Sequence, residues 1–372
     1  MNITELEKIT EQIKRYQLED EIKDVENWLR NLNEKRIKNF VNISIEPHQL
    51  RGILKSKSLL INEAALNGDY YLEDIKFVNE AKRDGILVGL SFVAQDINSL
   101  ESRYHREDMK QIANAKTDEI AYSLRDVACS KYSLESKYHK EDMKQTANAK
   151  TDEIAACLSN VACSKDSLES EYHREDMRLI ADAKNDVISQ YLRNVVMDKD
   201  SLESEYHEED MKLIADAKND VIANCLSNVA CRKDSLESEH HREDMKLIAD
   251  AKNNVTAYSL RDVACSKYSL KSKCHREDMK LIANAKTDEI AACLRKEASS
   301  KDSLESEYHK EYMKFIANGK TIYNAAEKIY KEKYRNFSMT FQEKIDAIHQ
   351  NAKEYIDGDT TKELDDSVFT LK

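Results

Sequence analysis

Residues that interrupt helices are scarce in this chain: its 372 residues include one proline and six glycines. Proline and glycine are the two residues that destabilise a helix interior most. Charged residues, by contrast, make up 34% of the chain, and Glu, Lys, Ala and Leu are abundant. This composition predicts a protein that is nearly all helix.

Long apolar runs are absent as well. No segment approaches the roughly 18 apolar residues that a transmembrane helix needs, and the first residues, MNITELEKITEQIKRYQLED, have no apolar core of the kind found in a secretory signal. A formal net charge of −12 argues against a nucleic-acid-binding protein, which normally carries a basic face. We therefore expect a soluble, cytoplasmic protein that binds neither membranes nor nucleic acid.

The motifs of common catalytic sites are also missing. The sequence contains no glycine-rich phosphate loop, no nucleophile elbow and no His-Glu-x-x-His segment. Adjacent carboxylates such as Glu175 and Asp176 point in different directions on a helix, so they give no support for a general acid–base pair. We expect a protein that is not an enzyme and carries no cofactor, and we assign no catalytic, cofactor-binding or metal-binding residues.

What the chain does contain is a repeat of 34 residues, which runs with little change from Glu101 to Leu304. A histidine in the segment Tyr-His-x-Glu-Asp-Met marks each copy: His105, His139, His173, His207, His241, His275 and His309. A fixed period of this length is typical of a solenoid, in which each repeat packs on its neighbours.

The repeat divides the chain into four parts. They are an N-terminal helical segment (1–66), the tandem repeats (67–318), a Tyr-rich C-terminal helical cap (319–357) and an acidic flexible tail (358–372). The first copy, Asn67–Leu100, is degenerate, as is usual for a terminal repeat. We expect Gly85 and Gly89 to interrupt the second half of this copy.

Each copy must turn back on itself. Over 34 residues a straight helix advances by about 160° beyond whole turns, so equivalent leucines of successive copies would lie on nearly opposite sides of a continuous rod. We predict a first helix from about Asp166, with the capping box Asp-Ser-Leu-Glu, to about Lys184. A second helix is predicted to start after Asn185-Asp186, with Thr117, Thr151 and Thr287 as the equivalent caps.

The predicted fold class is therefore all-α: an α-solenoid of tandem 34-residue helical-hairpin repeats with helical N- and C-terminal caps. The period equals that of the tetratricopeptide repeat. The spaced Trp, Leu-Gly, Tyr, Ala and Pro signature of that family is not present, so no family resemblance is inferred.

The eight cysteines fall mostly at two positions of the repeat. One position has Cys129, Cys163, Cys231 and Cys265, and also Met197 and Ser299. The other has Cys157, Cys225 and Cys293, and also Ser123, Tyr191 and Ser259. Positions that accept Met, Ser or Tyr in place of Cys are packing positions, so we expect free thiols in a reducing compartment.

The recurring His-x-x-Asp is the pattern that most suggests a site. On the first helix His173 and Asp176 are three residues apart and share a face, with Lys184 near the same side. Stacked copies would form a ladder of these side chains. One hypothesis is a row of metal or small-anion sites with ligands from adjacent repeats; the other is a polar network between repeats, or a solvated helix edge.

Solenoids usually act as binding scaffolds. We therefore expect a non-catalytic scaffold that binds another protein or peptide, of basic character, through an extended acidic surface. The alternatives are a metal- or anion-binding array that uses the His/Asp ladder, and a structural spacer. The aromatic residues of the C-terminal part could form a binding surface, although a cap over the last repeat is the interpretation we favour. These residues are Tyr323, Tyr330, Tyr334, Phe337, Phe341 and Tyr355.

Overall fold

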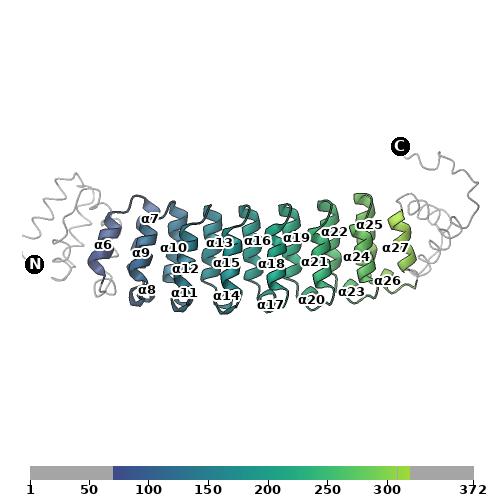
Figure 1. Ribbon diagram of the computed structural model, residues 1–372, viewed down its shortest axis with the longest axis horizontal. Coiled ribbons are helices and arrows are strands. Elements are labelled where there is room, and N and C mark those ends of the chain that lie inside the picture. The colour runs from purple at the N-terminus through teal and green to yellow at the C-terminus, as the bar shows by residue number, and fades with distance from the viewer. Residues whose placement is uncertain (1–69, 308, 319–372) are drawn as a thin grey trace, which may run out of the picture. The chain divides into compact units, whose positions relative to one another are not determined.

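The structure is a computed structural model that describes residues 70–307 and 309–318, and these residues form helices and no strands (Figure 1). The all-α prediction and the 34-residue helical repeat are confirmed for this part of the chain, which is an α-solenoid. The predicted N-terminal helices, C-terminal cap and acidic tail lie outside the described residues. The chain divides into two units, Met1–Leu202 and Glu203–Lys372.

Each repeat contains three helices: one of four or five residues, here called the short helix, and two longer ones, the A helix and the B helix. In the first unit the A helices are α6 (Tyr71–Asn79), α9 (His105–Ala113), α12 (His139–Ala147) and α15 (His173–Ala181). The B helices are α7 (Asp84–Val93), α10 (Asp118–Cys129), α13 (Asp152–Ala162) and α16 (Asp186–Val196). The short helices are α8 (Ile97–Glu101), α11 (Lys131–Glu135), α14 (Lys165–Glu169) and α17 (Lys199–Leu202).

The second unit continues the same order. Its A helices are α18 (His207–Asp216), α21 (His241–Ala249), α24 (His275–Ala283) and α27 (His309–Asn318). Its B helices are α19 (Asp220–Ala230), α22 (Asn254–Ala264) and α25 (Asp288–Ala298). Its short helices are α20 (Lys233–Leu236), α23 (Lys267–Leu270) and α26 (Lys301–Leu304). None of the described helices is long and apolar enough to cross a membrane.

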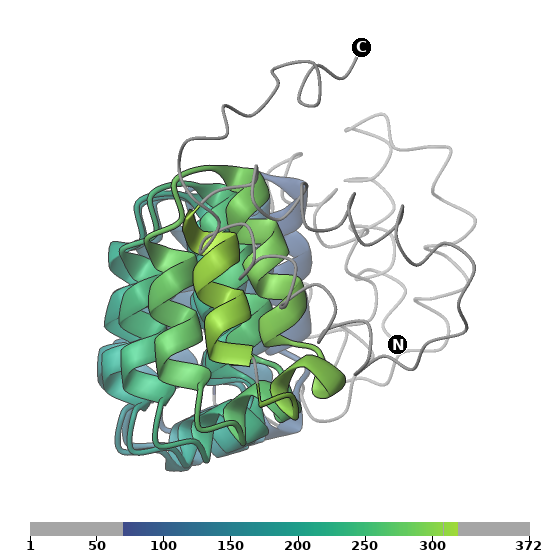
Figure 2. The ribbon, with the colours of Figure 1, turned by 90° about the vertical axis from the view of Figure 1, so that its right-hand side faces the viewer.

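Within each unit, A helices pack beside A helices and B helices beside B helices, and the short helices follow one edge (Figure 2). The A helices contribute a methionine and, in most copies, an isoleucine to the core, as Met177 and Ile180 do with 0% exposure. The B helices contribute a leucine and, in every one but α25, a valine, such as Leu192 and Val195, also at 0% exposure. The helical apolar pattern of the sequence thus faces the space between the two layers.

The prediction of one long first helix is wrong. The helix expected from Asp166 to Lys184 is two helices, α14 and α15, because Ser170 has an extended backbone with φ −70° and ψ 143°. The Ser170 hydroxyl accepts a hydrogen bond from the Tyr172 backbone N–H at 3.1 Å, and such a local bond competes with helical backbone bonding. The N-cap is also not Asp166: the Ser164 hydroxyl accepts from the Ser167 N–H at 3.4 Å.

The start of the second helix is confirmed. The Asn185 side chain accepts a hydrogen bond from the backbone N–H of Ile188 at 2.9 Å and caps α16. Three threonines do the same for an isoleucine three residues on: Thr117, Thr151 and Thr287. These caps satisfy backbone donors that have no partner inside the helix.

Gly85 and Gly89 do not interrupt their helix, contrary to the prediction, because α7 is continuous across both. They allow α7 to lie close to α10. A Cβ on Gly89 would lie 3.3 Å from the carbonyl oxygen of Ala121, and a Cβ on Gly85 would overlap the side chain of Asp118. The degenerate first copy is thus a complete helix pair that packs unusually tightly on the next repeat.

Candidate functional site

A chain of three buried polar side chains joins neighbouring repeats within each unit. In the first unit the Ser133 hydroxyl lies 2.9 Å from His139 Nδ1, and His139 Nε2 lies 2.9 Å from a carboxylate oxygen of Asp108. The aspartate and the serine belong to one copy of the repeat, whereas the histidine belongs to the next copy, 31 residues after the aspartate. The contact therefore crosses the interface between stacked repeats.

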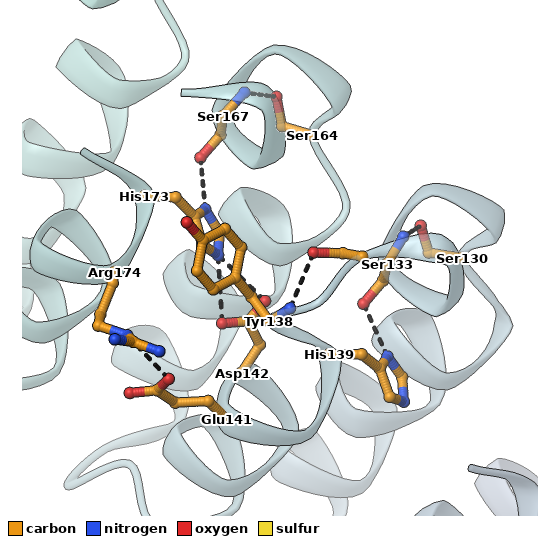
Figure 3. A network of polar contacts seen from close by, with 11 residues as sticks. Ser130, Ser133, Tyr138, His139, Glu141, Asp142, Ser164, Ser167, His173 and Arg174 are labelled. Carbon is orange, nitrogen blue, oxygen red and sulfur yellow. Dashed lines mark hydrogen bonds and ion pairs between the residues drawn. The ribbon is translucent and has the colours of Figure 1, made fainter. Parts of the chain in front are cut away.

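The same chain recurs in both units with distances of 2.8–3.2 Å. Its other members are Ser99–His105–Asp74, Ser167–His173–Asp142, Ser235–His241–Asp210, Ser269–His275–Asp244 and Ser303–His309–Asp278. Figure 3 shows Ser167 and Asp142 on opposite sides of the His173 ring. We call this arrangement the Ser–His–Asp chain.

The break in the predicted first helix positions this chain. Because the backbone turns at Ser170, α14 folds back so that Ser167 faces His173, the first residue of α15. Asp142 lies in the first turn of α12, where a helix favours negative charge. A single continuous helix could not bring the serine against the histidine six residues on, since such residues point away from each other.

The side chains of the Ser–His–Asp chains are buried from solvent. Every serine, histidine and aspartate named in them is at most 2% exposed. Burial raises the pKa of Asp108, Asp142 and Asp210, and the hydrogen bond from the histidine opposes that rise. A neutral imidazole that donates from Nε2 to the carboxylate and accepts the serine hydroxyl at Nδ1 gives each buried group a partner.

This geometry favours the polar network over the metal or anion ladder. A metal would need a ring nitrogen, but in these six histidines both nitrogens contact protein groups. No cluster of three or more possible metal ligands occurs among the described residues. Lys184, which the ladder included, is exposed, and the third member of the chain is a serine.

The Ser–His–Asp chain also differs from a catalytic triad. In a triad the carboxylate orients Nδ1 and the nucleophilic serine meets Nε2; here the serine is on Nδ1 and the aspartate on Nε2. Ser133 is 0% exposed, so its hydroxyl cannot reach a substrate.

The cysteines occupy packing positions, as predicted. All eight are free thiols; Cys157 and Cys225 are buried and the others are half-buried. Burial raises the pKa of Cys129 to about 12 and those of Cys163 and Cys225 to about 11. These three groups are therefore protonated at neutral pH, which makes them poor nucleophiles and poor metal ligands.

An aromatic ring covers most of these histidines on the solvent side. Tyr104 lies over His139 with ring centroids 4.6 Å apart, and Tyr138 lies over His173 at 4.8 Å (Figure 3). In the second unit Tyr206 covers His241 at 5.0 Å, and His240 covers His275 at 4.8 Å. Each covering residue directly precedes the histidine of one repeat and packs on the histidine of the following repeat, so it links the half-buried edge with the buried chain.

The exposed face of the A helices carries ion pairs between repeats. Each joins the residue after a repeat histidine to a glutamate of the preceding repeat: Arg106–Glu73, Arg174–Glu141, Arg242–Glu209, Arg276–Glu243 and Lys310–Glu277. Many of the acidic residues of this face are therefore neutralised by a neighbour. The negative net charge of the chain therefore overstates the negative charge of this face.

Exposed charge gathers where each short helix meets its A helix, and its sign differs between copies. In the first unit the edge at His105 and His139 has exposed Arg103, Arg106, Lys137 and Lys140 beside half-buried Tyr104 and Tyr138; we call these six residues the basic edge. In the second unit the edge at His207 and His241 has exposed Glu203, Glu205, Asp234, Glu237 and Glu239; we call these five the acidic edge. Neither sign extends over a whole unit, since Glu171 of the first unit and Lys273 of the second are exposed at the same edge. Sequence reasoning predicted an acidic surface but missed the basic edge, because the net charge hides it.

A hollow of about 940 Å³ lies over α7 and the end of α10. Its walls include Val88 and Phe92, and the Arg125 guanidinium lies 5.4 Å from the centre of the Phe92 ring. Arg125 also pairs with Asp126 at 2.6 Å. Arg125 and Asp126 thus satisfy each other, and the wall around Phe92 is apolar, so the hollow does not present a set of converging catalytic groups.

Comparison of the chain with protein-family models, curated proteins and solved structures finds no match.

Proposed function

We propose that this protein is a non-catalytic helical-repeat scaffold that binds a basic segment of another protein along the acidic edge of its second unit. One observation carries this proposal: exposed carboxylates recur at the same repeat positions in consecutive repeats, as Glu203 with Glu237 and Glu205 with Glu239. Cationic groups of a partner would meet matching charge at both of these repeats, which favours encounter and sets the register of binding.

The repeat spacing defines the partner more closely. Packed helices lie roughly 10 Å apart, and an extended peptide advances about 3.3 Å per residue. Every third residue of an extended segment thus meets the next repeat. The partner is a segment with Lys or Arg at intervals of three residues, and we place the interaction in the cytoplasm, where the free thiols stay reduced.

A peptide-binding titration tests this function. The probe is a fluorescent 12-residue peptide with Arg at every third position, with a peptide of the same composition and clustered Arg for comparison. The double variant Glu205→Gln and Glu239→Gln is expected to weaken binding at least tenfold. Added salt is expected to weaken the binding of the unmodified protein, because the contact is electrostatic.

A matched control removes the same charge elsewhere on the same repeats. Asp216 and Asp250 are exposed at the far ends of α18 and α21, and other copies have Asn at this position, as at Asn114 and Asn284. The double variant Asp216→Asn and Asp250→Asn is expected to bind within about twofold of the unmodified protein. Equal binding of the spaced and clustered peptides would contradict register recognition, and failure of both to bind would favour a structural spacer.

A further inference from the structure

We propose that the basic edge of the first unit is a second binding surface, which takes an acidic, extended peptide segment of another protein. This surface is opposite in sign to the acidic edge and lies in the other unit. The inference therefore does not depend on the proposed function and can stand or fail separately.

The basic edge is a local exception on an acidic chain. Arg103 and Lys137 stand two residues before a repeat histidine, a place we call position −2, in two consecutive copies. The later copies have Glu171, Glu205, Glu239, Lys273 and Glu307 there, so no other two neighbouring copies are both basic. Lys137 and Lys140 form no ion pair with any carboxylate of the described residues, whereas Arg106 pairs with Glu73 at 2.8 Å. Two consecutive repeats thus present cations that are available to a partner.

The cations at position −2 are held in place by aromatic rings. The Arg103 guanidinium lies 4.7 Å from the centre of the Tyr104 ring, and Lys137 Nζ lies 4.7 Å from the centre of the Tyr138 ring. Each tyrosine is itself fixed against the histidine of the following repeat. Binding to such a surface costs less side-chain entropy than binding to freely rotating lysines, and fixed aromatic rings beside arginine are typical of interface hot spots.

The chemistry of the edge fits separate carboxylates better than a continuous chain of phosphates. Exposed Glu101, Glu107 and Glu135 lie between and beside the cations in sequence. A nucleic acid places a phosphate at each nucleotide and would meet these carboxylates as well as the cations. An extended peptide with Asp or Glu at every third residue can direct its charges to successive repeats, about 10 Å apart, and leave neutral residues opposite the glutamates.

The test uses a substitution that the repeat already contains. Arg103→Glu with Lys137→Glu gives two copies the residue found at Glu171, so the fold is expected to keep its helical content and melting temperature. The probe is a fluorescent 12-residue peptide with Glu at every third position. The double variant is expected to bind it at least tenfold more weakly than the unmodified full-length protein.

The control changes charge by the same amount on the same repeats. Lys116 and Lys150 are exposed beyond the other end of α9 and α12, and Lys116→Glu with Lys150→Glu is expected to bind within about twofold of the unmodified protein. Equal loss in both double variants would show that only net charge matters, and it would overturn the proposal. So would unchanged binding of the Arg103→Glu, Lys137→Glu variant.

Two further measurements exclude other occupants. If an oligothymidylate of 12 nucleotides binds the basic edge more tightly than the peptide, and the charge reversal abolishes that binding, the surface takes nucleic acid and the proposal is wrong. If sedimentation shows a concentration-dependent dimer that the same reversal dissolves, the occupant is a second copy of this chain, and the proposal is again wrong. Tight peptide binding without either result supports it.

Discussion

The two units have the same interior, whereas the charge at their edges changes from copy to copy. Both bury Ser–His–Asp chains with distances of 2.8–3.2 Å. In both, the histidine is covered by an aromatic ring from the preceding repeat, such as Tyr104 over His139 and Tyr206 over His241. At position −2 the first unit has Arg103, Lys137 and Glu171, and the second has Glu205, Glu239, Lys273 and Glu307. The fold thus accepts either sign at this position, which we propose determines what each group of copies binds.

The comparison separates residues that hold repeats together from residues that we propose recognise partners. Near-identical copies make recurrence weak evidence of importance, since a residue can recur because it was copied. Variation is more informative here. Position −2 is Arg, Lys or Glu, whereas the residue two places later is histidine in all seven of these copies. Four predictions challenge or refine this separation, in order of decreasing effect.

The largest effect is expected from the shared interior. Asp142→Ala in the first unit and Asp244→Ala in the second each leave a buried histidine N–H without its acceptor, at His173 and His275. Each change is expected to lower the free energy of unfolding by about 3 kcal/mol, because a buried polar group loses its partner. Urea unfolding followed by circular dichroism measures this loss.

The two losses should be similar, because the interiors are alike. Asp→Asn at the same two positions is the control: the amide oxygen can still accept from Nε2, so the loss should fall to about 1 kcal/mol. A large loss in one unit and none in the other would show that the interiors are not equivalent.

A smaller effect is expected where the interior of the second unit departs from the pattern. Glu297 stands where the other copies have a buried valine, such as Val263, and is itself 8% exposed. Burial raises the pKa of Glu297, and a hydrogen bond with Ser303 opposes the rise. Replacing Glu297 with Val is expected to stabilise the protein by about 2 kcal/mol at pH 7, because it removes a buried charge and restores an apolar contact.

The sign of the pH dependence follows from that shift. A carboxyl with a raised pKa in the folded state contributes stability that is fully present below its unfolded pKa of 4.5 and is lost as the pH rises through the folded pKa. The advantage of Glu297→Val should therefore be small near pH 4 and grow toward pH 7. Glu297→Gln should remove the pH dependence while keeping a polar group; an advantage independent of pH would exclude ionisation as the cause.

Exchanging the edges tests whether position −2 sets the choice of partner. Glu205→Lys with Glu239→Lys gives the two copies of the acidic edge the positive charge that Arg103 and Lys137 carry at this position. The variant is expected to bind the Arg peptide at least tenfold more weakly, or about 1.4 kcal/mol, and to gain binding of the Glu peptide. Anisotropy titrations of both peptides measure the exchange, and a loss without any gain would place acidic-peptide recognition elsewhere on the first unit.

The smallest effect is expected from the ion pairs on the A helices. Arg242→Ala removes the contact with Glu209, but the arginine side chain is 60% exposed. The free energy of unfolding should fall by less than about 0.5 kcal/mol, because exposed ion pairs contribute little. Arg174→Ala, which removes the contact with Glu141, should give the same result in the first unit. A loss above about 1 kcal/mol in either would mean that these pairs hold the repeats together.

The sequence predicted the repeat, the second helix and its cap, because these depend on periodicity and on contacts a few residues apart. It did not predict the break at Ser170, since serine is also compatible with a continuous helix. Nor did it identify the partner of each histidine: a helical wheel relates His173 to Asp176 on its own helix, whereas the contact is with Asp142 of the preceding repeat.

The first and last copies of the repeat contain the sequence evidence that identifies the partner of each histidine. The first copy has Tyr71 in place of the histidine but keeps Asp74, and Asp74 contacts His105. The last copy keeps His309 but has Tyr312 in place of the aspartate, and Glu343 stands where a following histidine would be. Aspartate thus occurs where a histidine follows in the next copy, which is the pattern of a contact between repeats.

Each histidine of a Ser–His–Asp chain lies 31 residues after its aspartate, so the aspartate is synthesised first. A ribosome releases the chain from its N-terminus, so Asp108 emerges before His139, and Asp142 before His173. Each new repeat therefore joins a predecessor that already displays the required carboxylate. During synthesis the most recently made repeat carries an aspartate whose histidine partner has not yet been added. In the last copy Tyr312 stands in place of this aspartate, so that copy has no carboxylate at this position.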